Sequence, residues 1–169
     1  DMKDYVEGNY SADNQLGDEA EARKGESRLW KYYEGIRKAS TFIVNVDRCP
    51  ELTMDEIADM KGQARFLRAY CYWALIRVYG PVPLIPLEGL DVNLSYEELS
   101  LPREHFDNLV DFIDQELAES ARSLPTKRTV NNLGRPTRGA ALGLRSRVLL
   151  YAASPLFNGN TDFFNVKDC

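Results

Sequence analysis

The feature that most constrains the fold is one uninterrupted helical segment from residue 54 to residue 79. Thr53 and Glu56 match a capping box, in which each side chain pairs with an otherwise unpaired backbone N–H. Gly80 supplies a left-handed C-terminal cap, and Pro81 prevents the helix from continuing. Side chains that recur every three or four residues mark two faces, so we expect burial on two sides, between other helices. One face carries Ile57, Met60, Ala64, Leu67, Cys71, Leu75 and Val78, and the other carries Phe66, Tyr70, Trp73 and Arg77.

Three further helices are predicted. A helix over residues 27–47 has two stripes, one with Leu29, Tyr33, Ile36, Ser40 and Ile43, the other with Tyr32, Ala39, Phe42 and Val46. A helix from Pro102 to Leu124 has a single apolar stripe that begins at Phe106, with proline at the first-turn position it favours. A helix from Pro136 to Ala153 is rich in small residues. Gly143 costs that helix stability, so it predicts close approach of a neighbouring helix.

These elements predict an all-α fold of antiparallel helix pairs with irregular loops. Residues 27–79 form the first pair, residues 80–101 a proline-rich extended connector, and residues 102–153 the second pair. Residues 1–26 form an acidic loop segment, and residues 154–169 begin a following loop region. The arrangement is close to two tetratricopeptide-type units, although the 34-residue consensus does not recur cleanly. Stacked units need neighbours on both sides, so we expect residues 1–169 to be part of something larger.

Composition excludes several classes of function. A net charge of −5 and a pI near 5.0 argue against nucleic-acid binding. No apolar run is long enough to span a bilayer. The cysteines Cys49, Cys71 and Cys169 are too widely spaced for a zinc or redox motif. His105 is the only histidine, which removes most nucleophile–base schemes. We therefore expect no metal, no cofactor and no enzymatic activity.

Four segments, in order, resemble the SusD/RagB family. The first is Trp30-Lys31-Tyr32-Tyr33-Glu34-Gly35-Ile36-Arg37-Lys38-Ala39 with Phe42-Ile43, and the second is Ala64-Arg65-Phe66-Leu67-Arg68-Ala69 with Tyr79-Gly80-Pro81-Val82-Pro83. The third is Phe112-Ile113 with Glu116-Leu117, Ala121 and Leu124-Pro125, and the fourth runs from Gly134-Arg135-Pro136-Thr137-Arg138-Gly139-Ala140-Ala141 to Leu149-Leu150-Tyr151-Ala152. Each segment alone is weak, and the ordered set over residues 30–157 is specific. Ser40 stands where the family usually has asparagine.

The resemblance implies a non-catalytic, cell-surface nutrient-binding protein, with residues 1–169 as the N-terminal part of a SusD-like domain. Members of the family capture oligosaccharides and deliver them to a TonB-dependent, SusC-like transporter in Bacteroidetes-type bacteria. They sit on the extracellular face of the outer membrane, held by an N-terminal lipid anchor that we expect to lie outside residues 1–169. A peptide-binding, RagB-like member is the nearest alternative. A tetratricopeptide-like scaffold that docks protein partners is the alternative from another class.

Candidate ligand contacts combine aromatic faces with polar groups that can pair with sugar hydroxyls. The acidic N-terminal segment provides such a mix in Asn9, Tyr10, Asp13 and Asn14, next to Tyr5; a solvated surface loop is the plainer interpretation. Trp30, at the head of the first helix, could offer a stacking face. Its size favours a core position instead.

Basic residues are predicted to pair with acidic ones. Arg65, Arg68 and Arg77 could form an anion site, but packing of their stems and pairing of their heads is favoured. Residues 127–147 hold six basic residues and no acidic one. This stretch could face lipid phosphates or nucleic acid, but pairing with the acidic third helix and the acidic N-terminus is favoured.

Overall fold

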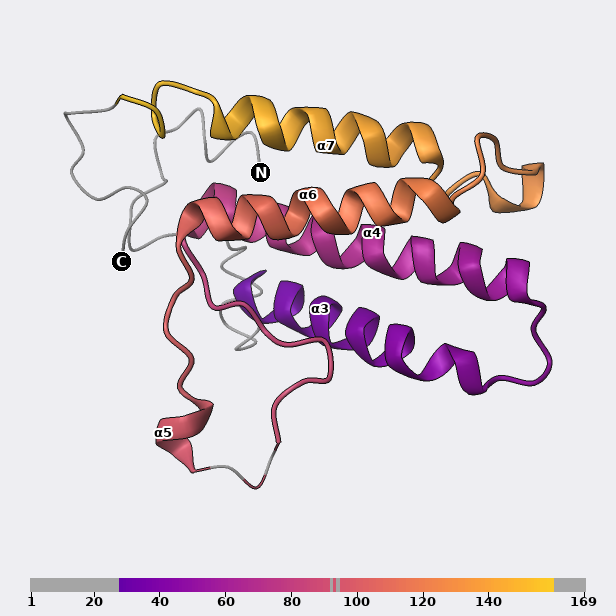
Figure 1. Cartoon of the computed structure of the whole chain (residues 1–169), viewed down its shortest axis with the longest axis horizontal. Coiled ribbons are helices and arrows are strands. Elements are labelled where there is room, and N and C mark those ends of the chain that lie inside the picture. Colours follow the sequence, from indigo (N-terminus) through magenta and orange to yellow (C-terminus); the bar gives the residue numbers. More distant parts are fainter. Residues whose placement is uncertain (1–27, 92, 94, 160–169) are drawn as a thin grey trace, which may run out of the picture.

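The computed structural model describes residues 28–91, 93 and 95–159. Within these residues the chain is all-helical, and four long helices lie side by side in one layer (Figure 1). Each runs antiparallel to its neighbour in the sequence, in the spatial order α3, α4, α6, α7. The elements are α3 (Arg28–Asn45), η1 (Val46–Arg48), α4 (Met54–Tyr79), α5 (Tyr96–Leu99), α6 (Phe106–Ser123), η2 (Val130–Asn132) and α7 (Arg138–Ala152). The predicted fold class is confirmed.

The ends of α4 are those predicted from local signals. The Thr53 N–H donates to Glu56 Oε2 at 2.9 Å, and the Glu56 N–H donates to Thr53 Oγ1 at 3.3 Å. Gly80 has φ +65°, a backbone conformation that glycine adopts without a Cβ penalty, and its N–H donates to the Ile76 carbonyl at 3.1 Å. Both termini of α4 are therefore set by residues adjacent in the sequence.

Burial on two sides of α4 is confirmed, with changes in which residues are inside. Tyr72, Leu75 and Ile76 are almost fully buried and share one core with residues of α3, α6 and α7. That core also contains Ile36, Phe106, Leu109, Ile113, Leu117 and Val148. Four residues assigned to the buried faces are instead exposed, namely Leu67, Tyr70, Arg77 and Val78. On α3, the predicted stripe residue Phe42 is also exposed, at 40%.

Two helices begin later than predicted, and one short helix was missed. Helix α6 begins at Phe106 rather than at Pro102, because the Glu104 N–H donates to the Val82 carbonyl at 3.0 Å and holds the preceding residues extended against the connector. Helix α7 begins at Arg138, after the Thr137 cap. Inside the predicted extended connector, α5 follows a capping box of Ser95 and Glu98.

Close approach of helices occurs at glycines other than the predicted one. A Cβ on Gly35 would lie 3.0 Å from Cys71 Sγ, and one on Gly62 would lie 3.0 Å from Ser123 Cβ. These contacts are where α3 meets α4 and where α4 meets α6. Gly143, in contrast, is exposed, and no described atom beyond its own helix lies within 4 Å of a Cβ built there. The prediction of a helix packed on Gly143 is wrong within the described part of the chain.

Candidate ligand-binding site

Of the five predicted contact residues, the structure describes Trp30. Asn9, Tyr10, Asp13 and Asn14 lie outside the described residues. Trp30 lies in the first turn of α3 and is 67% exposed, so the favoured core position is wrong. The buried face of α3 is centred on Ile36, and at 3.6 residues per turn Trp30 points about 120° away from it. Helical periodicity therefore directs the indole toward solvent.

Trp30 opens onto a cavity of about 420 Å³ at the head of α3, which we call the Trp30 cavity. Its aromatic wall is formed by Trp30, Tyr33 and Tyr79, from the first turns of α3 and the last turn of α4. Its other walls come from the connector and the segment after α5, and include Val82, Pro83, Ile85, Leu99, Ser100, Leu101 and Arg103. Three aromatic rings beside a hydroxyl and a guanidinium suit a ligand with both apolar faces and hydroxyl groups.

Hydrogen bonds from side chains to backbone carbonyls hold the connector in place around this cavity. The Tyr33 hydroxyl donates to the Pro83 carbonyl at 3.0 Å, and Arg103 Nη1 donates to the Pro81 carbonyl at 3.4 Å. Burial raises the pKa of the Tyr33 hydroxyl well above its usual value, so this group remains a hydrogen-bond donor through the physiological range. The Tyr33 hydroxyl and one N–H of Arg103 thus fix the path of the connector along the cavity wall.

A buried arginine anchors the connector from below. Arg68 on α4 is 3% exposed, and its Nη2 donates to the Ile85 carbonyl at 2.9 Å. The Ile85 N–H in turn donates to the hydroxyl of buried Tyr72 at 2.9 Å. The Arg68 guanidinium also lies 4.8 Å from the centre of the Phe112 ring. We call Arg68 and Tyr72 the Ile85 clamp.

The arginines of α4 are engaged in packing and pairing, as predicted. Arg65 Nη1 lies 2.5 Å from Glu116 Oε1, and Arg68 Nη1 lies 3.7 Å from Glu116 Oε2. Burial raises the pKa of Glu116, against the lowering effect of the two arginines. Arg77 lies over the ring of Trp73, with its guanidinium carbon 5.2 Å from the ring centre. These side chains do not form an open anion site.

The basic stretch 127–147 pairs partly as predicted. Arg145 of α7 makes two hydrogen bonds to Asp114 of α6, at 2.5 and 3.0 Å, which confirms pairing with the third long helix. Arg128 instead binds Asp59 of α4, at 2.6 and 2.8 Å. Pairing with the acidic N-terminal segment falls outside the described residues.

The described part of the chain carries no set of groups arranged for catalysis. His105 caps α6, with its Nδ1 accepting from the Asp107 N–H at 3.3 Å. Residues 28–91, 93 and 95–159 hold no group of three or more His, Cys, Asp or Glu side chains able to bind a metal ion. None of the helices in those ranges is long and apolar enough to cross a membrane.

Fold and site together define a helical protein with a cavity walled partly by aromatic side chains. The chain belongs to the SusD-like family, because the family model described as SusD-like and "starch-binding associating with outer membrane" matches residues 5–150. The family resemblance expected from the sequence is confirmed. The family is one of binding proteins rather than enzymes, which agrees with the non-catalytic role expected from the sequence.

Individual relatives match most of this chain. The SusD-like protein P25 of Formosa agariphila is 24% identical over 143 residues, which make up 83% of this chain and 26% of that protein. A SusD-like crystal structure from Bacteroides fragilis is 31% identical, with a TM-score of 0.65 over 73% of this chain and 23% of that one. Surface glycan-binding protein A from Bacteroides uniformis is 26% identical, with a TM-score of 0.64 over 73% of this chain and 27% of that one. The chain spans about a quarter of the length of these relatives.

Sequence reasoning missed most of the Trp30 cavity. Tyr79 and Arg103 line it from segments far apart in the sequence. Tyr79 was interpreted only as the end of one predicted helix, and Arg103 only as part of the first turn of another. A usable signal was available for Tyr33, which lies three residues after Trp30 and therefore on the same side of α3. The folded path of the connector, which completes the cavity, has no comparable local signal.

Proposed function

We propose that the protein is a non-catalytic, cell-surface binding protein that captures an oligosaccharide and delivers it to a TonB-dependent, SusC-like transporter. Membership of the SusD-like family over residues 5–150 carries this proposal. The Trp30 cavity is its candidate sugar contact. The exposed indole provides a face on which a sugar ring can stack, and Arg103 and Ser100 provide polar partners for hydroxyl groups.

Location follows the same proposal. The family is described as associating with the outer membrane, and a lipid anchor at the extracellular face would hold the protein beside its transporter. Residues 1–169 would then be the N-terminal part of a SusD-like domain, with residues 27–79 and 102–153 as its first two helix pairs. Capture of a sugar at the cell surface and its transfer to a transporter require reversible binding and no catalysis. The Trp30 cavity is suited to such binding.

We prefer a glycan over a peptide as the ligand because one protein of similar structure, from Bacteroides uniformis, is a surface glycan-binding protein. Peptide binding and protein scaffolding remain as outcomes of the test. Isothermal titration calorimetry should use the protein in its full natural length, against starch-, β-glucan- and mannan-derived oligosaccharides and against peptides. Binding of peptide but of no sugar would contradict the glycan assignment, and binding of neither would favour the scaffold.

A substitution at Trp30 tests the cavity itself. Trp30→Ala should weaken sugar binding roughly five- to thirtyfold, or about 1–2 kcal/mol, as for an aromatic contact at the centre of a binding site. Met54→Ala is the matched control. Met54 is 79% exposed and lies at the first residue of α4, whereas the cavity is lined by Tyr79 at the last. Equal affinities for the Trp30→Ala variant and the unchanged protein would remove the cavity from the proposed site.

Transfer to a transporter requires its own measurement. The protein should co-purify from detergent-solubilised outer membranes with a TonB-dependent transporter. Its recovery without any such partner would contradict the delivery step and leave the binding step standing.

A further inference from the structure

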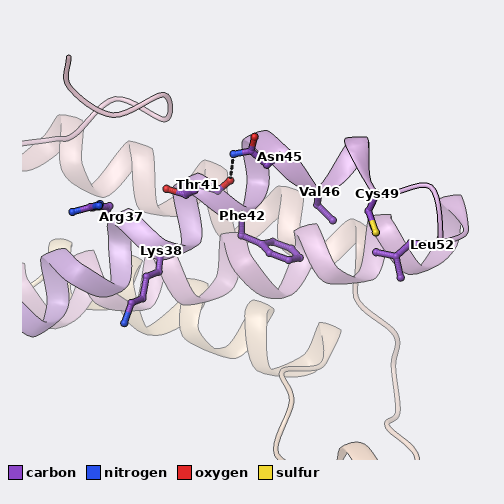
Figure 2. Close-up of a pocket in the computed structure, with 8 residues that line it drawn as sticks. All are labelled: Arg37, Lys38, Thr41, Phe42, Asn45, Val46, Cys49 and Leu52. Atoms are coloured by element: carbon purple, nitrogen blue, oxygen red, sulfur yellow. Dashed lines mark hydrogen bonds between the residues drawn. The ribbon is translucent and has the colours of Figure 1, made fainter. Parts of the chain in front are cut away.

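A second hollow lies on the exposed side of α3, well away from the Trp30 cavity. We call it the α3 groove; its volume is about 560 Å³. Its apolar end is formed by Phe42, Val46, Cys49 and Leu52, from the end of α3, η1 and the loop that leads to α4. Figure 2 shows these four side chains gathered at one end of the groove, with Arg37 and Lys38 at the other. The groove thus has an apolar end and a basic end.

The helix that carries the groove is basic, although the chain as a whole is acidic. Helix α3 contains four basic residues (Arg28, Lys31, Arg37 and Lys38) and one acidic residue (Glu34), which gives 4 − 1 = +3, whereas the whole chain has −5. Lys38 pairs with Glu34 at 2.5 Å, but both side chains are mostly exposed, and such pairs contribute little. The basic end is therefore available to an acidic ligand.

Polar groups along the groove remain able to bind. Arg37 is exposed and makes no hydrogen bond or ion pair with the described residues. The Thr41 hydroxyl makes no hydrogen bond to them either. The Asn45 amide donates through Nδ2 to the Thr41 carbonyl at 2.8 Å, which leaves its Oδ1 as an acceptor (Figure 2). A guanidinium, a hydroxyl and an amide oxygen line one side of the same hollow.

We propose that the α3 groove binds an acidic saccharide, that is, a sugar chain whose units carry carboxylates. The 40%-exposed ring of Phe42 would contact the C–H face of one sugar unit, and the planar guanidinium of Arg37 would pair with a carboxylate. Arg37 and Phe42 lie five residues apart, which places them about 7.5 Å apart along α3 and about 140° apart around it. Both side chains line the hollow, so one oligosaccharide lying across this surface of α3 would contact both. This inference rests on the proposed glycan capture and adds a charge class and a second contact surface.

The test compares oligogalacturonate with its methyl ester, which has the same sugar backbone without the charge. Calorimetry on the protein in its full natural length should give tighter binding of the free acid, with affinity that falls as salt is raised. Arg37→Ala should weaken binding of the free acid about tenfold, or about 1.4 kcal/mol, and should leave the ester unaffected. Phe42→Ala should weaken binding of both.

Matched control variants separate the groove from general effects of charge and of exposed apolar residues. Arg48→Ala removes the same charge from an exposed residue just beyond α3 that does not line the groove. Val44→Ala removes an apolar side chain that is 37% exposed on α3 but lies outside the groove. Both variants should bind oligogalacturonate with the affinity of the unchanged protein.

Cys49 provides a second, spatial measurement. Its thiol lies in the groove and is partly exposed, whereas burial raises the pKa of Cys71 to about 11 and makes that thiol unreactive near neutral pH. In a Cys169→Ser variant, oligogalacturonate should slow the reaction of Cys49 with a maleimide several-fold, and the methyl ester should slow it less.

The outcomes separate this inference from the proposed function. Oligogalacturonate binding that is unchanged in Arg37→Ala, or that fails to protect Cys49, overturns the groove assignment. A glutamate-rich peptide that binds through Arg37 when oligogalacturonate does not also overturns it. In either case, Trp30-dependent binding of a neutral oligosaccharide would leave the proposed function intact. If no saccharide of any kind binds, both fall together.

Discussion

The Ile85 clamp predicts that Arg68 stabilises the fold and the Trp30 cavity together. The side chain is buried and combines a charged hydrogen bond to the Ile85 carbonyl, a contact with the Phe112 ring and an ion pair with Glu116. In Arg68→Met the stem still packs, but the charge is lost. Breaking a buried charged contact from one side costs about 3–5 kcal/mol. In this variant the Ile85 carbonyl loses its charged donor, the contact with the Phe112 ring loses its cation, and Glu116 keeps Arg65 as its remaining cationic partner.

The expected loss is large compared with the stability of an ordinary domain, about 5–15 kcal/mol. Urea unfolding at neutral pH, followed by circular dichroism, should show a free energy of unfolding lowered by about 3–5 kcal/mol in Arg68→Met. Arg77→Met is the matched control on the same helix, because Arg77 is exposed and lies over the Trp73 ring without an ion pair that the structure describes. It should cost less than about 1 kcal/mol.

A double variant tests whether the buried charge is the cause. Replacing both partners in Arg68→Met/Glu116→Leu removes the buried carboxylate that the single variant leaves behind. We expect at least about 1 kcal/mol of the loss to be recovered relative to the sum of the two single variants. A cost below about 1 kcal/mol for Arg68→Met, or strict additivity in the double variant, would refute the reasoning.

Three other predictions concern helix packing and a buried thiol. Gly62→Ala should lower the free energy of unfolding by about 1–3 kcal/mol in urea, because the new Cβ would lie 3.0 Å from Ser123 Cβ. Gly143→Ala should raise the free energy of unfolding by about 0.5–1 kcal/mol, because no described atom lies within 4 Å of the new Cβ. A lower free energy of unfolding in this variant would contradict that open space. The pKa of Cys71 is raised from 9.0 to about 11 in the folded state, so the free energy of unfolding should fall as the pH rises from 9 to 11. In Cys71→Ala it should fall less steeply with pH, and equal pH dependence in the two proteins would contradict the shift.

Local signals in the sequence were sufficient for the ends of α4 and for the single buried stripe of α6. Thr53, Glu56 and Gly80 act on neighbouring backbone groups, so their effects do not depend on the rest of the fold. The start of α6 was wrong for the opposite reason. Pro102 suits a first helical turn, but a hydrogen bond between Glu104 and the distant Val82 holds that segment extended.

Packing between helices was harder to predict because it depends on the register of one helix against another. The sequence does not distinguish Gly62, which contacts α6, from Gly143, which lies in the open. Pairing of Arg145 with Asp114 followed from the acidic character of the third long helix. The partner of Arg128, Asp59, could be identified only once α4 was placed beside the segment that joins α6 to α7.

The candidate site was predictable in part. Trp30 was identified as a possible stacking face, although its size favoured a core position. The rest of the Trp30 cavity is assembled by the connector, which the Ile85 clamp folds against α4 through contacts between residues 13 and 17 positions apart in the sequence. Those contacts involve the backbone carbonyl and N–H of Ile85, groups that nearly every residue has, so the pattern of side chains does not predict them.

Sugar capture at Trp30 is tested most directly by its own fluorescence. The chain has two tryptophans, and Trp73 is only 3% exposed, so Trp73→Phe leaves Trp30 as the sole indole reporter. We predict that an oligosaccharide found to bind by calorimetry will protect this indole from quenching by acrylamide, in proportion to the fraction of protein bound. Full binding by calorimetry with quenching of Trp30 unchanged would contradict the account.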